Sequence, residues 1–146
     1  MKKKSITVGC QVSFAKTVSE SDIYLFAGIT GDLSPNHVNR EYMKQTSYGR
    51  RIAHGSLLIG YMSTASSLLL QQYPDSDNET TPVSLGYDRV RFIKPVFIND
   101  TITVNYTVEN FDSERNRSYS HVEIVNQNNE TVAVAKHILK WVPNAG

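Results

Sequence analysis

One stretch of the sequence, residues 53–72, constrains the fold more than any other. It reads AHGSLLIGYMSTASSLLLQQ, and its large apolar residues recur at helical spacing in two neighbouring stripes. The first stripe holds Leu57, Tyr61, Ala65 and Leu68, and the second holds Leu58, Met62 and Leu69. Gly60, Ser63, Ser66 and Ser67 keep the remaining faces small, so the helix is apolar or small almost all round. Such a helix must be wrapped by the rest of the protein.

The wrapping material is predicted to be β-structure. Four later segments are rich in β-branched residues or alternate between apolar and polar residues, and residues 6–18 predict a first strand or hairpin. The four segments are residues 83–93, 100–111, 117–127 and 130–141. One long helix with strands before and after it indicates an α+β fold, in which an antiparallel sheet curls around the helix. The length of 146 residues suits a single domain over residues 1–146.

Shorter elements precede the long helix. Residues 19–30 predict a helix with Ser19 or Ser21 as its N-cap, and Gly31 ends it. Residues 31–39 are expected to form a loop, and residues 40–49 a short helix or turn with Tyr42 and Met43 facing inward. Residues 73–82 are expected to form the loop after the long helix.

Composition limits the possible partners. Fifteen basic and 14 acidic side chains nearly balance, which argues against nucleic acid as the main partner but allows a small anionic ligand. No apolar run approaches the length of a membrane span, so no membrane partner is expected. The single cysteine, Cys10, cannot form an internal disulfide, and no cluster of cysteine and histidine has the spacing of a zinc site. We therefore expect no metal and a location in the reducing cytoplasm.

The stretch GDLSPNH, residues 31–37, places a carboxylate and an imidazole on one short loop. Asp32 and His37 lie on either side of Pro35, which stiffens the turn. Such a pair can hold one water molecule over a substrate and exchange protons with it. The alternative is that Asp32 caps a helix and His37 is an ordinary loop residue.

The stretch AHGS, residues 53–56, stands where the long helix begins. The backbone N–H groups of Gly55 and Ser56 belong to the unsatisfied first turn and attract developing negative charge. Glycine also allows a ligand to approach the backbone closely. The alternative is that Gly55 only eases a tight start to the helix. His54 could face the ligand, although packing at the helix start is the better interpretation of this residue alone.

Together these stretches match a family. The order G-D-x-x-P-x-H, then A-H-G, then RFIKPVFINDTI at residues 91–102 resembles the MaoC-like (R)-specific enoyl-CoA hydratases. The resemblance runs from about Val8 to Val142. It implies the hot-dog fold, a homodimer with its active sites at the subunit interface, and further pairing of dimers as an open possibility. It also implies reversible addition of water to trans-2-enoyl-CoA, giving (R)-3-hydroxyacyl-CoA, with no metal or organic cofactor.

The resemblance also implies roles for individual residues. The family's catalytic carboxylate falls on Asp32 and its imidazole on His37, while its oxyanion glycine falls on Gly55 and a supporting serine on Ser63. Three further residues are candidates for binding the substrate. They are Asn36 at the variable position before the histidine, His54 beside the oxyanion glycine, and Ser56 where many relatives have methionine.

Other functions stay open at this point. A 3-hydroxyacyl dehydratase acting on carrier-protein thioesters would use the same motif. A non-catalytic acyl-CoA-binding module would not need Asp32, His37 and Gly55 together, and hydrolysis by a hot-dog thioesterase does not call for this arrangement. Four tyrosines could line an acyl pocket, although core packing is the better interpretation. They are Tyr24, Tyr42, Tyr48 and Tyr61.

Overall fold

The elements follow the predicted order of strand, helices and strands. The structure, a computed structural model, describes residues 5–76 and 78–146. The elements are β1 (Gln11–Thr17), α1 (Glu20–Thr30), α2 (Pro35–Val38), α3 (Arg40–Lys44), α4 (Gly55–Gln72), β2 (Thr80–Phe92), β3 (Thr101–Asp112), β4 (Arg117–Val125) and β5 (Thr131–Pro143). No helix in the described residues is long and apolar enough to cross a membrane.

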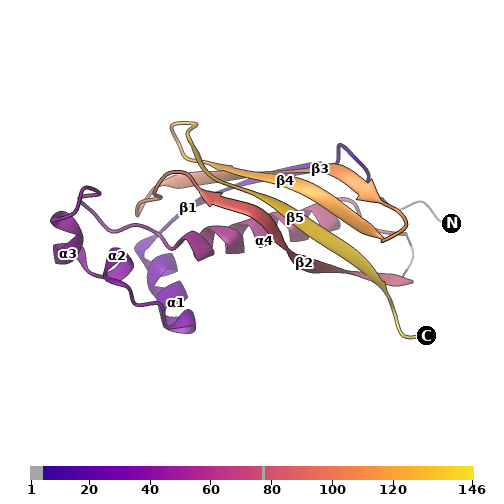
Figure 1. The fold of residues 1–146 in the computed structure, drawn as a ribbon, viewed down its shortest axis with the longest axis horizontal. Coiled ribbons are helices and arrows are strands. Elements are labelled where there is room, and N and C mark those ends of the chain that lie inside the picture. The colour runs from indigo at the N-terminus through magenta and orange to yellow at the C-terminus, as the bar shows by residue number, and fades with distance from the viewer. Residues whose placement is uncertain (1–4, 77) are drawn as a thin grey trace.

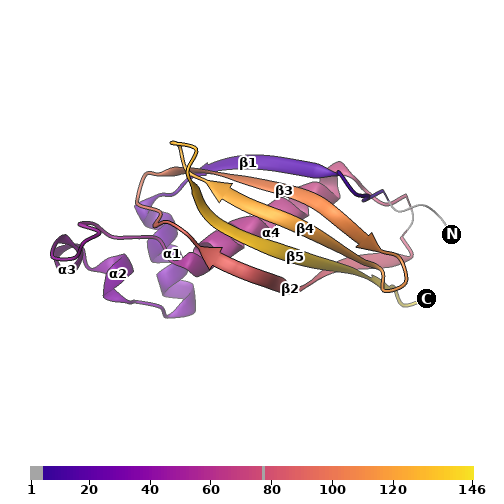
Figure 2. The ribbon, with the colours of Figure 1, turned by 45° about the horizontal axis from the view of Figure 1, so that its top comes forward.

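The strands form one sheet in the order β1-β3-β4-β5-β2, and each neighbouring pair is antiparallel. α4 crosses one face of this sheet, and α1 to α3 gather beyond one end of it (Figures 1 and 2). The core joins the inner face of the sheet to the second predicted stripe of α4, whose residues Leu58, Met62 and Leu69 are buried. The predicted α+β arrangement, with an antiparallel sheet wrapped around one long helix, is confirmed.

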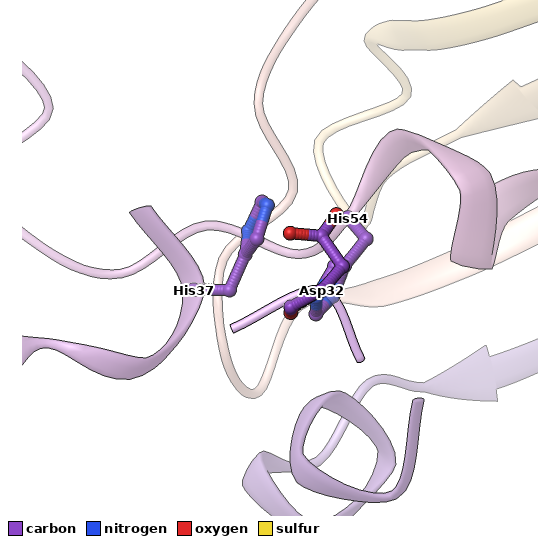
Figure 3. A group of neighbouring side chains, drawn as sticks. All are labelled: Asp32, His37 and His54. Carbon is purple, nitrogen blue, oxygen red and sulfur yellow. Dashed lines mark hydrogen bonds between the residues drawn. The ribbon is translucent and has the colours of Figure 1, made fainter. Parts of the chain in front are cut away.

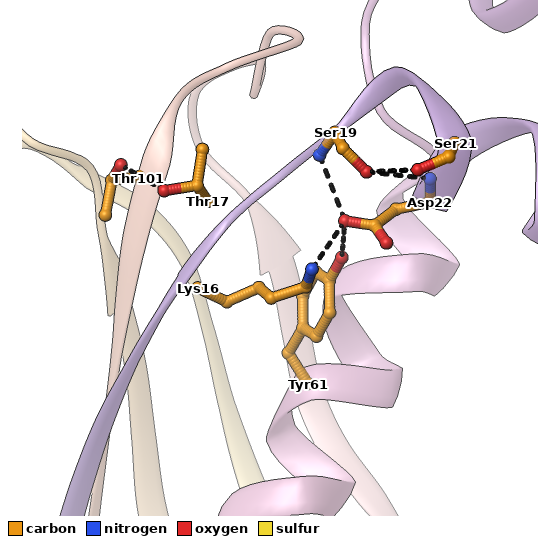
Figure 4. Close-up of polar contacts among 7 residues, drawn as sticks. All are labelled: Lys16, Thr17, Ser19, Ser21, Asp22, Tyr61 and Thr101. Atoms are coloured by element: carbon orange, nitrogen blue, oxygen red, sulfur yellow. Dashed lines mark hydrogen bonds and ion pairs between the residues drawn. The ribbon is translucent and has the colours of Figure 1, made fainter.

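The start of α1 is tied to its surroundings by Asp22. Ser19 is the N-cap: its hydroxyl accepts from the N–H of Asp22 at 3.1 Å, and its own N–H donates to the Asp22 carboxylate at 3.0 Å. The same carboxylate pairs with Lys16 of β1 at 2.9 Å and accepts from the Tyr61 hydroxyl of α4 at 3.5 Å (Figure 4). α1 therefore begins at a fixed place between β1 and α4, and this fixes where α1 ends.

Three local expectations were wrong. Residues 35–38 form a short helix within the expected loop, because Pro35 has the fixed φ that suits the first position of a helix. Tyr42 is 51% exposed, and Met43 alone of that pair is buried. β2 begins at Thr80 and includes Pro82, which the edge of a sheet tolerates because an outward N–H is not needed there.

A buried histidine on the inner face of the sheet is the centre of a polar network. His137 of β5 is 0% exposed, and its Nδ1 and Nε2 lie 2.8 Å from the Tyr106 hydroxyl and 2.7 Å from the Ser84 hydroxyl. The Tyr87 ring stacks on it at 4.3 Å. Burial lowers the pKa of His137 from 6.5 to about 4, because the charged ring would lose its hydration there.

Candidate active site

The loop after α1 brings Asp32 and His37 into place. Gly31 ends α1 in the left-handed conformation, with φ 81°, which a glycine adopts without strain. Asp32 follows directly and is exposed, and its carboxylate accepts from the N–H of Ser34 at 3.3 Å. Pro35 then starts α2, the helix that carries His37. The turn and the short helix hold the carboxylate and the imidazole on one side of the loop.

Two hydrogen bonds join α2 to the segment before α4. The Nδ1 of His37 lies 2.7 Å from the carbonyl oxygen of Ile52, and the N–H of Ile52 donates to the carbonyl of Asn36 at 3.0 Å. A carbonyl oxygen can only accept, so Nδ1 of His37 carries the hydrogen. The neutral ring then has its lone pair on Nε2, which is the nitrogen that can take a proton from water.

His54 completes a group of three side chains. One side-chain nitrogen or oxygen atom from each of Asp32, His37 and His54 lies within 4.8 Å of the others (Figure 3). The His54 ring stacks on the His37 ring at a centroid distance of 3.7 Å, and its Nε2 lies 3.0 Å from the carbonyl oxygen of Asp32. His54 is only 2% exposed. The loop and the start of α4 therefore meet at these residues.

Gly55 is the first residue of α4, and its neighbour across the site is Phe92. The N-cap residue, His54, makes no side-chain bond to the first turn, so no side chain caps the N–H groups of Gly55 and Ser56, while the N–H of Leu57 donates to the His54 carbonyl at 3.1 Å. A Cβ atom at Gly55 would lie 2.6 Å from the Phe92 ring, which is closer than two carbons can pack. Glycine allows this close approach, and a side chain there would have to push the half-exposed Phe92 ring aside.

A cavity of about 240 Å³ opens beside these groups. Its walls come from α2, from the segment before α4, from the start of α4 and from the end of β2 with the loop after it. The lining residues are His37, Tyr48, Ile52, Ala53, Gly55, Leu58, Phe92, Ile93, Lys94, Pro95 and Val96. His37 and the start of α4 thus border one space lined mostly by apolar residues, which suits a small organic ligand.

The group of three suits a water molecule better than a metal ion. The rings of His37 and His54 are stacked, with an interplanar angle of 27°, so the lone pairs in their planes run side by side and do not converge. One nitrogen of each ring also already faces a backbone carbonyl. A metal would need ligand atoms aimed at a single point, whereas a water can be held by one acceptor and one carboxylate.

The other predicted site residues lie at varying distances from this group. Asn36 is exposed on α2 beside His37, and Ser56 is exposed on the first turn of α4 beside Gly55, but neither is among the residues that line the cavity. Ser63 is exposed on α4, eight residues after Gly55, or about 12 Å along the axis. Asp32, His37, His54 and Gly55 are brought together, and Ser63 is not part of their group within one chain.

Two aromatic residues of the site went unrecognised in the sequence. Phe92 covers Gly55, and Phe26 of α1 contacts the His54 ring at 4.7 Å. Phe92 belongs to the motif RFIKPVF, but only its contact with glycine reveals what the aromatic ring does. Of the four candidate tyrosines, Tyr48 lines the cavity.

Comparison with known proteins identifies the family of this chain. Residues 4–132 match the family model described as MaoC like domain. The (R)-specific enoyl-CoA hydratase of Rhodospirillum rubrum is 40% identical over 112 residues, which cover 77% of this chain and 72% of that protein. The 3-hydroxybutyryl-CoA dehydratase of Methylorubrum extorquens is 31% identical over 115 residues, covering 79% and 68%.

Solved structures give the same result for the fold. The (R)-hydratase of Aeromonas caviae, described as involved in PHA biosynthesis, superimposes with a TM-score of 0.81 at 25% identity, covering 94% of this chain and 98% of that one. A monoamine oxidase regulatory protein from Archaeoglobus superimposes with a TM-score of 0.80 at 29% identity, covering 97% and 93%. The predicted hot-dog fold is confirmed, and the chain belongs to the MaoC-like family.

Proposed function

We propose that this chain catalyses the reversible addition of water to a trans-2-enoyl-CoA, giving the (R)-3-hydroxyacyl-CoA. It is a hydro-lyase acting on CoA thioesters, as the names of its relatives in R. rubrum and M. extorquens indicate for those proteins. The observation that carries the proposal is the meeting of Asp32 and His37 within one group of 4.8 Å beside the start of α4. No metal or organic cofactor is required by this chemistry.

The proposed mechanism uses one water molecule held between the Asp32 carboxylate and Nε2 of His37. The water oxygen forms a bond to C3, and the electrons of the C2–C3 double bond move toward the thioester oxygen. The proton that the water loses passes to the pair, which then returns a proton to C2 on the same face. Addition is therefore syn, and the pair ends as it began. General acid–base assistance of this kind typically contributes ~10²–10⁴-fold.

The negative charge on the thioester oxygen needs its own partner. The N–H of Gly55 is our candidate, because it belongs to the first turn of α4 and borders the cavity that His37 also lines. A donor fixed in advance toward such an oxygen lowers the barrier by roughly 3–4 kcal/mol. Asn36 and Ser56, exposed on either side, remain candidate contacts for the substrate, and Ser63 remains a candidate supporting residue.

The active form is proposed to be a homodimer. β2 is an edge strand, and an edge strand offers unpaired backbone groups to a second chain. Its residues Leu85 and Phe92 are 47% and 52% exposed, and the exposed face of α4 carries the small residues Gly60 and Ser63. A second copy seated there would lie against the site. A single domain over residues 1–146 and a location in the cytoplasm complete the proposal.

Crotonyl-CoA provides the direct test. Loss of its enoyl absorbance on addition of the protein, with the (R)-alcohol as product, is the expected result. Asp32→Asn should abolish the loss, and Glu114→Gln, which changes an exposed carboxylate in the turn between β3 and β4, should leave it unchanged. An acyl-CoA-binding module would show no turnover, and a dehydratase specific for carrier proteins would act on crotonyl carrier protein in preference to crotonyl-CoA.

A further inference from the structure

His54 contacts both members of the proposed catalytic pair. It lies outside the motif that holds Asp32 and His37, and it is buried where a ligand-contacting residue would be open to the cavity. Neither His54 nor Asp32 is among the residues that line the cavity, but the Asp32 side chain is exposed and can reach a ligand, whereas His54 is only 2% exposed. Its contacts run instead to the backbone of Asp32 and to the ring of His37 (Figure 3).

The hydrogen bond fixes the form of the His54 ring. The carbonyl oxygen of Asp32, 3.0 Å from Nε2, can only accept, so Nε2 of His54 donates. In the neutral ring Nδ1 then carries the lone pair, and this buried atom has no hydrogen-bond partner among the described residues. Leaving a buried polar atom unpaired costs stability. The hydrogen bond at Nε2 is therefore the one hydrogen bond of this ring within residues 5–76 and 78–146, and it goes to the backbone of Asp32.

This hydrogen bond matters for the position of Asp32. Asp32 follows the last turn of α1 and is exposed, so packing of its own side chain does little to hold it. His54 holds its backbone carbonyl, while its own ring is in contact with both His37 at 3.7 Å and Phe26 at 4.7 Å. One buried ring thus connects α1, the loop, α2 and the start of α4. Because a misplacement of about 1 Å can cost on the order of 10²-fold in rate, such a connection matters.

We infer that His54 is a positioning residue, which sets the distance between the Asp32 carboxylate and the His37 imidazole and does not itself touch the substrate. The inference rests on the proposed function, because it gives His54 a role in that reaction. The sequence made His54 a candidate for binding the substrate. The inference instead gives His54 the role of holding Asp32 and His37 in place. If the inference is right, full activity needs both the aromatic ring of His54, which stacks on His37, and its Nε2–H group, which donates to the Asp32 carbonyl.

Two variants separate the ring from the donor. His54→Gln keeps an amide N–H that reaches toward the Asp32 carbonyl but loses the stacked ring, and His54→Phe keeps an aromatic ring but loses the donor. Each should lower kcat for crotonyl-CoA hydration by on the order of 10²-fold, while KM stays within a small factor of wild type. His121→Gln on β4 is the matched control and should leave both constants unchanged.

A double-mutant cycle with His37 decides between positioning and general support of the fold. Residues that act as a unit are not additive, so His54→Gln should have almost no further effect on kcat once His37→Gln is present. A raised KM with normal kcat would mean that His54 binds substrate, and an additive loss would mean that it only supports the fold. Either result overturns the inference. Wild-type protein without hydratase activity would instead overturn the proposed function.

Discussion

Acidification should destabilise this protein before its surface carboxylates begin to titrate, because His137 is buried without charge. A histidine in the unfolded chain takes up a proton below its usual pKa of 6.5, whereas the folded pKa of His137 is lowered to about 4 by burial. Between these values the unfolded chain binds more protons than the folded one, so the free energy of unfolding falls as the pH falls. Above about pH 7 this contribution to stability is fully present.

The magnitude follows from the difference between the two pKa values. A lowering from 6.5 to about 4 corresponds to about 3 kcal/mol, and about 2 kcal/mol of that is already lost at pH 5. The side chain is 0% exposed, so solvent does not screen the effect. Its two ring nitrogens face the hydroxyls of Tyr106 and Ser84, and neither residue offers a carboxylate that could neutralise a proton on the ring.

Urea denaturation at pH 7, 6 and 5 measures the effect directly. His137→Gln keeps a polar side chain but cannot take up a proton, so its free energy of unfolding should be lower at pH 7 and much flatter between pH 7 and pH 5. His121→Gln, which alters a half-buried histidine of β4, should keep the wild-type slope. A wild-type protein whose stability is unchanged from pH 7 to pH 5 would refute the reasoning.

Further predictions concern the site and the assembly. Asp32→Asn and His37→Gln should each lower kcat roughly 10²–10⁴-fold at unchanged melting temperature, and the double variant should lose far less than the product of the two; fully active but destabilised variants would mean that residues 31–37 are only a turn. Gly55→Val should lower kcat by orders of magnitude, because even a Cβ there meets the Phe92 ring at 2.6 Å. Phe92→Ala in the same chain should restore melting temperature but not kcat, and normal turnover in Gly55→Val would place the oxyanion donor elsewhere. Sedimentation at micromolar concentration should find a dimer, and a fully active monomer would contradict a site completed by a second copy.

The fold was readable from the sequence where one physical requirement dominated. The two apolar stripes predicted that α4 would be covered by the rest of the chain, and the structure buries the stripe of Leu58, Met62 and Leu69 most completely. Ser19 and Gly31 predicted the ends of α1, because capping chemistry is local. Tyr42 was wrongly predicted to face inward, because a helix of one turn is too short for the spacing of its apolar residues to show which side faces the core.

The site was readable only in part, for a similar reason. Asp32 and His37 are five residues apart in the sequence, so a short loop was enough to predict that they meet. The contact of Phe92 with Gly55 and that of Phe26 with His54 join residues 37 and 28 positions apart. Such contacts depend on how the end of β2 and the side of α1 pack against α4, and no local pattern carries that information.

The order of the strands also determines when the protein can fold during its synthesis. β5 lies between β4 and β2 in the sheet, yet it follows both of them in the chain. Until β5 has left the ribosome, β2 has no partner strand. α4 then lies against a partial sheet of β1, β3 and β4. Pairing over such a sequence distance is slow, and exposed strands invite aggregation meanwhile. Loss of the last few residues of β5 would remove the partners of residues 80–83 at the start of β2, whereas Phe92 beside the cavity pairs with Ala133 near the start of β5.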